Sequence, residues 1–550
     1  ELDSHGNPVI VTVFSEKGVL LDSHRVDDAS TGLRAKVREA VSEVRDSRRT
    51  RKRGLDASGN FQPVYIHIQV VSYTGRFPNF GIKGLFDNKV YEPRVTGLIY
   101  ELDGKRVDLD PLTALYRNLN SKLSRQYLSK KLGIKPQLMP STNKMWIEIY
   151  QVMHFGESRP NRTLAEYHRG HEIFRAEDVT NEILMDRLKH IGTWYKNNVI
   201  DNEVTYQYGV NSEKYFNHKR TMVRSTMAVW ILNRLATFLD DDELRSLGKQ
   251  TMEYYHERYF NMKRSIEKGK IIPSSQALKN GNLVEKRWTT AGFIASAALE
   301  RKEYKKYKVE VDLLFDWLML YLEDNGIFWT QFGQSQYFMP GQALLAISYI
   351  YEETGEKKYL DFFEKAFNAY EQPLISMMKL GNKRYAPFAP AWFTQPFAKM
   401  YELTKNPRYR DMVYMINDRV SQWYAMNADH ELYFDYDGIM TPKAGFYGNN
   451  SITSASLESI ADAAYVAKLE GDEARLKAYG KIIRQTTAYL LRLQYTPENS
   501  YYVRHRDRVL GGFKQDLVNN LVWCDNVWHL TSAFIKIYKH KLLDVTAPAD

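Results

Sequence analysis

The pattern of apolar and polar positions changes character along the chain. In the first part, short runs alternate apolar and polar residues and end at Gly or Asp, which predicts strands and hairpins, while two other stretches have helical spacing. The strands are expected at 9–14, 19–26 and 64–73, the hairpin at 97–109, and the helices at 31–45 and 112–132. Prolines then break the pattern. We therefore expect an α+β domain over residues 1–135, a connecting segment over 136–180, and a second domain over 181–550.

From residue 181 onward the apolar spacing is helical, and two kinds of helix alternate. The first kind is long, charged and amphipathic, and is expected at 181–199, 243–262, 306–322, 359–374, 408–424 and 474–493. The second kind is poor in charge and rich in small residues, and is expected at 221–238, 289–299, 341–351, 391–403, 452–469 and 525–538. Because the second kind lacks a polar face, it must be buried on most sides.

The junctions between these helices repeat as well. Residues 351–359 align with 401–409 at an offset of 50 residues, and residues 469–474 are a shorter copy. Repeated helical hairpins cannot bury their apolar faces alone and must stack on their neighbours. Six charge-poor helices inside six amphipathic ones predict a mainly α fold, an (α/α)6 toroid preceded by the smaller α+β domain. An open α-solenoid with the same period is the alternative.

Composition is that of a water-soluble globular protein. The 550 residues are 44% hydrophobic and 26% charged, which excludes global disorder, and no apolar run reaches the roughly 18–20 residues of a membrane span. The single cysteine, Cys524, excludes an internal disulfide and a multi-cysteine zinc site. The chain starts at Glu1 rather than Met. We therefore expect a periplasmic or secreted protein if a leader was removed, and a cytoplasmic one otherwise.

Charge and aromatic content narrow the choice of partner. The formal net charge is +10, which favours an anionic partner, and 13% of residues are aromatic side chains of the kind that stack on sugars and bases. The most basic stretch, residues 48–53, has no nucleic-acid-binding motif around it and is interpreted as a solvated loop. We therefore expect a saccharide partner and no nucleic acid.

The loops that lead into the charge-poor helices are unusually polar and aromatic. A loop that only closes a hairpin is short and rich in Gly, Asn and Asp, whereas these carry Trp, Tyr, Phe, His and Gln in each repeat. In a toroid they gather at one end of the ring, so a binding funnel is expected there. Ser451, Thr289 and Asp525 also fit as caps of the helices that follow them.

One of these junctions carries a family resemblance. Residues 340–346, Pro-Gly-Gln-Ala-Leu-Leu-Ala, followed by Tyr349 and Tyr351, are similar to the glycine–glutamine start of an inner helix in C5-epimerase-like proteins. The helical part, residues 181–540, resembles the (α/α)6-toroid carbohydrate-active enzymes, which include glycoside hydrolases, polysaccharide lyases and uronyl C5-epimerases. The resemblance implies a fold and a polysaccharide substrate, and leaves the reaction open.

Two chemistries fit the residues at the junctions. Hydrolysis of a glycosidic bond needs two carboxyl groups, and Asp435, Asp437, Asp525 and Glu458 are available. Asp435 and Asp437 also fit a turn ending at Gly438 or a calcium loop, and Glu458 on its small-residue helix also fits structural pairing.

Lyase or epimerase chemistry on a uronate needs a group that neutralises the carboxylate and a base that removes the C5 proton. The candidate groups are Arg220, Arg224, Tyr337, Asn449, Asn450, Arg504, His505 and His529. The fifth and sixth repeats concentrate most of the ionisable groups of both chemistries.

We therefore predict a carbohydrate-active enzyme that cleaves or modifies an acidic polysaccharide, with hydrolysis favoured over elimination or epimerisation. The expected catalytic residues are Asp437, Asp525, His529 and Tyr337. The expected substrate-binding residues are Arg220, Arg224, Trp288, Gln342, Trp392, Asn449, Asn450, Arg504, His505 and Trp528. No metal or cofactor is expected. The alternatives from other classes are a non-catalytic glycan-binding scaffold in exopolysaccharide assembly and a peptide-binding helical repeat.

Overall fold

The structure is a computed structural model of the 550-residue chain. It describes residues 7–28, 30–53, 64–78, 91–135, 145–158, 163–217, 221–260, 264–267, 270–273, 284–330, 336–380, 389–422, 431–440 and 450–544.

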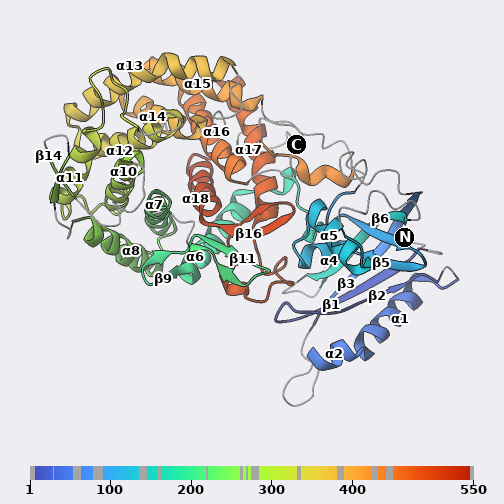
Figure 1. The fold of residues 1–550 in the computed structure, drawn as a ribbon. Helices are drawn as coiled ribbons and strands as arrows, with labels where there is room; N and C mark the ends of the chain where they lie inside the picture. Colours follow the sequence, from blue (N-terminus) through green and yellow to red (C-terminus); the bar gives the residue numbers. More distant parts are fainter. Residues whose placement is uncertain are drawn as a thin grey trace.

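The first part of the chain forms an antiparallel sheet that is covered by short helices (Figure 1). The strand order is β2 (Leu20–Val26), β1 (Val9–Ser15), β3 (Val64–Pro78), β6 (Met145–Ser158), β4 (Thr96–Leu102), β5 (Lys105–Leu109), and β7 (Thr163–His168) pairs with both β6 and β8 (His171–Glu172). The helix α1 (Leu33–Asp46) packs on β1 and β2, and α5 (Ser121–Leu132) packs on β5. The expected strands and hairpin are thus present at their predicted places.

Three expectations for this part were wrong. The segment 136–180, expected as a connector, supplies β6, β7 and β8, and β6 pairs with β3 and β4 in the middle of the sheet. Its odd-numbered side chains Met145, Ile147 and Ile149 are buried, so β6 has the alternation of a strand, and the prolines lie outside its bounds. The expected helix over 112–132 is divided into α4 (Pro111–Tyr116) and α5. The basic stretch is the helix α2 (Arg48–Arg53) rather than a loop.

The second part is the ring of paired helices in Figure 1. The inner helices are α7 (Met222–Leu239), α10 (Val284–Glu300), α12 (Met339–Thr354), α14 (Ala389–Thr404), α16 (Asn450–Glu470) and α18 (Cys524–Lys539). The outer helices are α6 (Asn181–Asn198), α8 (Asp242–Phe260), α11 (Lys308–Met319), α13 (Lys357–Leu380), α15 (Pro407–Ser421) and α17 (Glu473–Leu493). The charge-poor set is therefore inside and the amphipathic set outside, as the sequence predicts.

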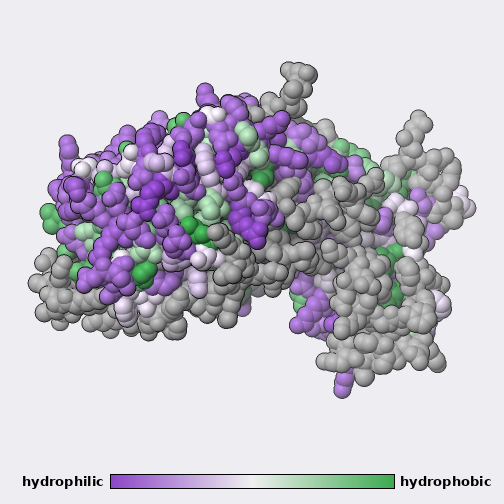
Figure 2. Space-filling model, turned by 90° about the horizontal axis from the view of Figure 1, so that it is seen from above, coloured by the Kyte–Doolittle hydropathy of each residue, from purple (hydrophilic) through white to green (hydrophobic). Residues whose placement is uncertain are grey.

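The ring is closed. Each inner helix packs against the next inner helix in sequence, and α18 packs against α7. The fold is therefore an (α/α)6 toroid, and the open solenoid is excluded. The face of the ring seen in Figure 2 is mostly hydrophilic, as expected for outer helices that present their charged sides to water. Among the described helices, none is long and apolar enough to cross a membrane.

Small residues let the inner helices approach closely. Ala343, Ala346, Ala461 and Ala464 are fully buried, and Ala398 nearly so, as predicted. At Gly341 a Cβ atom would lie 2.5 Å from the carbonyl oxygen of Trp392, so the first turn of α12 contacts the backbone of α14 directly. The glycine of the Pro-Gly-Gln motif is therefore required by the contact between α12 and α14.

A small four-stranded sheet joins the segments that precede α7 and α18. Its order is β12 (Lys214–Tyr215), β11 (Gln207–Gly209), β16 (Asn519–Trp523), β15 (Lys514–Asp516), so the segment before α7 pairs with the segment before α18. Because β16 runs directly into α18, this sheet fixes the start of α18 relative to the start of α7.

A buried ion-pair cluster joins the first part of the chain to the ring. The Arg169 guanidinium contacts Asp435 at 2.6 Å and Glu92 at 2.6 Å, and the Tyr436 hydroxyl donates to Glu92 at 2.6 Å. Burial alone would raise the pKa of Asp435, but the charge of Arg169 holds it well below its usual value. Asp435 is therefore a structural anion, and this role accounts for the residue without catalysis or calcium binding.

Arg169→Met is expected to lower stability strongly, because Asp435 and Glu92 then lose their common cation inside the protein. Breaking one partner of a buried ion pair costs about 3–5 kcal/mol, which urea or thermal unfolding would detect. Arg45→Met, at an exposed arginine of α1, is the control and should leave the transition unchanged. Similar behaviour of the two variants would show that the cluster contributes little.

Candidate active site

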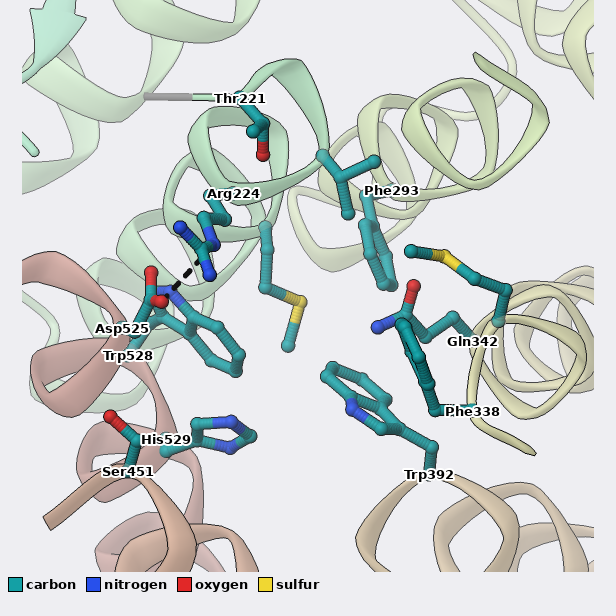
Figure 3. A pocket seen from close by; sticks show the side chains of 13 residues that line it. Thr221, Arg224, Phe293, Phe338, Gln342, Trp392, Ser451, Asp525, Trp528 and His529 are labelled. Carbon is teal, nitrogen blue, oxygen red and sulfur yellow. Dashed lines mark ion pairs between the residues drawn. The ribbon is translucent and has the colours of Figure 1, made fainter. Parts of the chain in front are cut away.

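A cavity of about 390 Å³ lies at the end of the ring where the inner helices begin (Figure 3). Its lining comes from the first turns of α7, α12, α14, α16 and α18, together with Phe293 from α10. The lining residues are Thr221, Val223, Arg224, Met227, Phe293, Phe338, Met339, Gln342, Trp392, Ser451, Asp525, Trp528 and His529. The cavity is thus at the place where the polar and aromatic junctions predict a site.

Asp525 is the carboxyl group of this cavity among the residues described. The Tyr206 hydroxyl donates to its Oδ2 at 3.3 Å, and Arg224 Nε lies 3.2 Å from the same oxygen (Figure 3). Arg224 also donates to the Tyr206 hydroxyl. Tyr206 directly precedes β11, and its carbonyl accepts from the amide of Cys524, so the four-stranded sheet holds Tyr206 beside Asp525.

The environment makes Asp525 easier to protonate than an ordinary aspartate. Burial raises the pKa of its carboxyl, and the nearby guanidinium of Arg224, together with the imidazole of His529, offsets that effect only in part. A carboxyl group whose pKa is raised can hold a proton closer to neutral pH, which is the property of a general acid.

His529 lies four residues after Asp525, on the same face of α18, and points into the cavity (Figure 3). Its Nδ1 atom lies 2.9 Å from Oε2 of Glu458, a fully buried residue of α16. Burial alone would raise the pKa of Glu458, but Lys536 and His529 lower it below its usual value. A carboxylate only accepts hydrogen bonds, so Nδ1 carries the proton and Nε2 is left as the basic nitrogen.

Aromatic rings surround this histidine. The ring centroid of Trp528 lies 3.7 Å from that of His529, and Trp392 lies 5.7 Å from His529 and 6.0 Å from Phe293. Trp392 and Trp528 are only 4% and 5% exposed. Both rings line the cavity, as expected for the aromatic junctions, but the hydrophobic core encloses most of their surface.

Six of the predicted site residues come together here. They are Asp525, His529, Arg224, Gln342, Trp392 and Trp528. Arg220, Asn449 and the side chain of Trp288 lie outside the described residues.

The other predicted residues do not line this cavity. Asp437 accepts from Gln485 Nε2 at 3.3 Å, and Tyr337 packs against the ring's hydrophobic core. Asn450 is buried and donates to the carbonyl of Lys514 at 2.8 Å, which ties the start of α16 to β15.

Arg504 and His505 lie at a different place from the cavity. They contact Glu213 at 2.8 and 3.2 Å, and Arg504 lines a separate cavity of about 310 Å³ between the ring and residues of the first part. Arg504 and His505 come before the sixth inner helix in sequence, but strands β15 and β16 intervene, so these residues do not lie at its first turn.

Sequence reasoning missed two functional contacts. Glu458 was weighed mainly as a structural partner, and its partner is the cavity histidine itself. Tyr206 received no role, and no pattern around it in the sequence distinguishes it from other tyrosines. The signal that works best is position: the lining residues cluster in the first two turns of inner helices. Among the residues described, no group of three His, Cys, Asp or Glu could hold a metal ion.

The chain matches no protein-family model and no curated protein. Among solved structures it is similar to a family 76 glycoside hydrolase from a bovine Bacteroides thetaiotaomicron strain, at 12% identity and a TM-score of 0.47 over 87% of this chain and 96% of that one. It is also similar to a variant of unsaturated glucuronyl hydrolase from Streptococcus agalactiae, at 12% identity and a TM-score of 0.46 over 66% of this chain and 92% of that one. An uncharacterized protein from Pyrococcus horikoshii matches 30% of this chain over 79% of its own length, at 14% identity and a TM-score of 0.24. Glycoside hydrolases of two kinds are thus among the structures that the chain resembles.

Asp525→Asn is expected to raise the melting temperature at pH 7. Folding raises the pKa of Asp525, so protonation of this carboxyl group favours the folded state. This contribution is fully present below the usual pKa near 3.8 and is lost as the pH rises through the pKa of the folded state. The neutral amide removes that loss at pH 7, so the gain should shrink toward pH 4. Asp316→Asn, at an exposed position of α11, is the control. A variant that is less stable at pH 7 would contradict the assigned environment of Asp525.

Proposed function

We propose that this protein is a carbohydrate-active enzyme that hydrolyses a glycosidic bond of an acidic polysaccharide in the cavity at the start of the inner helices. The observation that carries the proposal is the pairing, on one face of α18, of a carboxyl group that protonates easily with a histidine that a buried carboxylate orients. Cleavage of a glycosidic bond requires an acid and a base or nucleophile, which in most glycosidases are both carboxyl groups; in this proposal a histidine takes the role of the second carboxyl group.

Asp525 is the proposed general acid. Its raised pKa lets it carry the proton that the leaving sugar oxygen must receive, and Tyr206 and Arg224 hold its Oδ2 so that the carboxyl group cannot turn away. After the proton is transferred, Arg224 stabilises the carboxylate that remains.

His529 is the proposed general base. With Nδ1 engaged by Glu458, the Nε2 atom accepts a proton from a water molecule, whose oxygen then attacks the anomeric carbon. The imidazolium that forms is stabilised by the Glu458 carboxylate behind it. Side chains four residues apart on a helix have Cβ atoms about 5–6 Å apart, so acid and base face the same small cavity.

Substrate binding is assigned to Trp392 and Trp528 and to the polar group of Gln342. The accessible part of each aromatic ring supplies an apolar contact for a sugar ring, and the amide of Gln342 offers a donor and an acceptor to its hydroxyls. The net charge of +10 and the half-exposed Arg224 favour an acidic glycan. We further propose an extracytoplasmic location, where such polymers are found.

Elimination or C5 epimerisation of a uronate is the second candidate. It is favoured by the presence of Arg224, which could neutralise a uronate carboxylate, and by a described lining that holds one carboxyl group rather than two. His529 would then remove the C5 proton instead of activating water.

Asp525→Asn and His529→Ala are each expected to reduce turnover by about 10²–10⁴-fold, the usual loss for a general acid or base. Asp437→Asn is the matched control, because this aspartate lies near the same end of the ring but outside the cavity lining, and it should keep most of the activity. Rates would be measured on a panel of acidic and neutral glycans. Near-native rates for both cavity variants would reject the proposed site.

The product distinguishes the two reactions. Hydrolysis is expected to release reducing ends without new absorbance near 232 nm, whereas elimination produces that absorbance and epimerisation produces neither. Binding of glycans with no turnover on any member of the panel would favour the non-catalytic scaffold instead.

A further inference from the structure

A row of four ionisable groups crosses the inside of the ring from the candidate active site to a second cavity. His529 Nδ1 lies 2.9 Å from Glu458 Oε2, Glu458 Oε1 lies 3.6 Å from Lys536 Nζ, and Lys536 Nζ lies 2.8 Å from Asp462 Oδ2. Lys536 also donates to Gln395 at 3.0 Å. The row alternates between basic and acidic side chains, all from α16 and α18, and Gln395 joins it from α14.

The second cavity is at the opposite end of the ring. It has a volume of about 520 Å³ and is lined from the last turns of inner helices, and both Lys536 and Asp462 face it. Glu458 faces neither cavity, and its side chain is fully buried. The ammonium group of Lys536 is therefore the only described cation that contacts Glu458 from the side opposite to His529.

We propose that Lys536 is a positioning residue for the reaction. From the far side of Glu458, its positive charge disfavours an additional proton on the Glu458–His529 pair, which keeps Glu458 ionised and His529 neutral with Nε2 free toward the substrate. The inference rests on the proposed role of His529 as the base. It assigns a role in the reaction to a residue that contacts the second cavity and does not touch the first.

The argument follows the proton shared by His529 and Glu458. Without a neighbouring cation, a buried imidazole–carboxylate pair is most stable with one proton beyond the basic state, either as imidazolium and carboxylate or as imidazole and carboxylic acid. In the first form Nε2 carries a proton and is blocked, and in the second form the hydrogen bond from Nδ1 to the carboxylate is lost. A cation 3.6 Å from Glu458 disfavours that additional proton, whichever of the two atoms holds it.

Other charges around the pair do not replace Lys536. On the helices of the pair itself, the neighbouring groups are Asp462 on α16 and Asp525 and Ser532 on α18; on neighbouring helices, the polar groups that line the second cavity include Arg234 on α7, Glu300 on α10, Tyr349 on α12 and Gln395 on α14. Arg234 is engaged by Glu300 and Tyr349. Burial raises the pKa of Asp462 to about 6, so above that pH its anion partly offsets Lys536 but does not cancel its contact with Glu458.

Lys536→Met tests the assignment, because methionine keeps most of the volume and removes the charge. The first measurement needs no substrate: the ring resonances of ¹³C-labelled histidines are titrated by NMR, and the signal of His529 is assigned by its loss in His529→Gln. The midpoint for His529 should move upward by about one pH unit or more in Lys536→Met. Lys536→Arg, which keeps the charge, should restore the wild-type midpoint.

Lys399→Met is the matched control. Lys399 faces the same second cavity but pairs with Glu352 and Glu402 and does not contact Glu458. Its removal should leave the His529 midpoint and the pH profile of turnover unchanged. If Lys399→Met moves the midpoint as far as Lys536→Met, the effect is one of general charge, and the assignment is overturned.

The second measurement is the pH dependence of kcat/KM on an active glycan. In Lys536→Met the acid limb should move to higher pH by the same amount as the NMR midpoint, with near-native rates recovered above it, a recovery that a merely structural defect would not show. An unchanged midpoint in a folded Lys536→Met protein overturns the proposal. If Lys536→Met does not fold, Lys536→Gln, which can still hydrogen-bond to Gln395 and Asp462, carries the same test.

The two proposals fail in different ways. Suppose that the NMR midpoint is shifted in Lys536→Met but that turnover is undiminished in His529→Ala. The coupling of Lys536 to His529 would then be retained, but His529 would be rejected as the base, which overturns a role of Lys536 in the reaction. An unshifted midpoint together with a large loss of turnover in His529→Ala would keep the proposed function and reject Lys536.

Discussion

Close contact between the backbones of the inner helices is the constraint on which the structure depends. Six helices can surround one axis only if their facing residues are small, and Gly341 of α12 shows how strict this is, since a single Cβ would collide with α14. The residues that satisfy this constraint are also poor in charge, which is why the inner helices can be told apart from the outer ones in the sequence. The amphipathic outer helices then cover the inner ring and face water.

A closely packed ring restricts where polar chemistry can occur. Inside it an ionisable group is stable only with a partner, so Glu458, Lys536 and Asp462 occur as a chain of contacts rather than singly. At the two ends of the ring there are cavities, one lined from the starts of the inner helices and the other from their later turns. The candidate active site lies at one end, where the β11–β16 pair brings Tyr206 to the first turn of α18.

The sequence predicts the elements of the ring well and the site only in part. Helix positions follow from spacing and charge, and Asp525 and His529 could be found because the first two turns of the inner helices supply most of the cavity lining. Asp437, Arg504 and His505 are near the same helices in sequence. Asp437 comes directly after a 3-10 turn, and strands follow Arg504 and His505, so these side chains lie elsewhere. Periodicity does not reveal such excursions, nor does it show that β6 pairs between two strands far from it in sequence.

The two carboxyl groups near His529 illustrate why residue type alone could not assign the chemistry. Asp525 and Glu458 are both buried, and burial raises the pKa of each, yet the net shifts have opposite directions. Asp525 meets Arg224 at the edge of a cavity, where compensation is incomplete, whereas the fully buried Glu458 lies between His529 and Lys536. Two acids of similar intrinsic strength are thereby separated into one that can hold a proton and one that remains an anion, which is the division of roles that acid–base catalysis needs. The closed ring supplies that difference, because it places one carboxyl group at its open end and encloses the other.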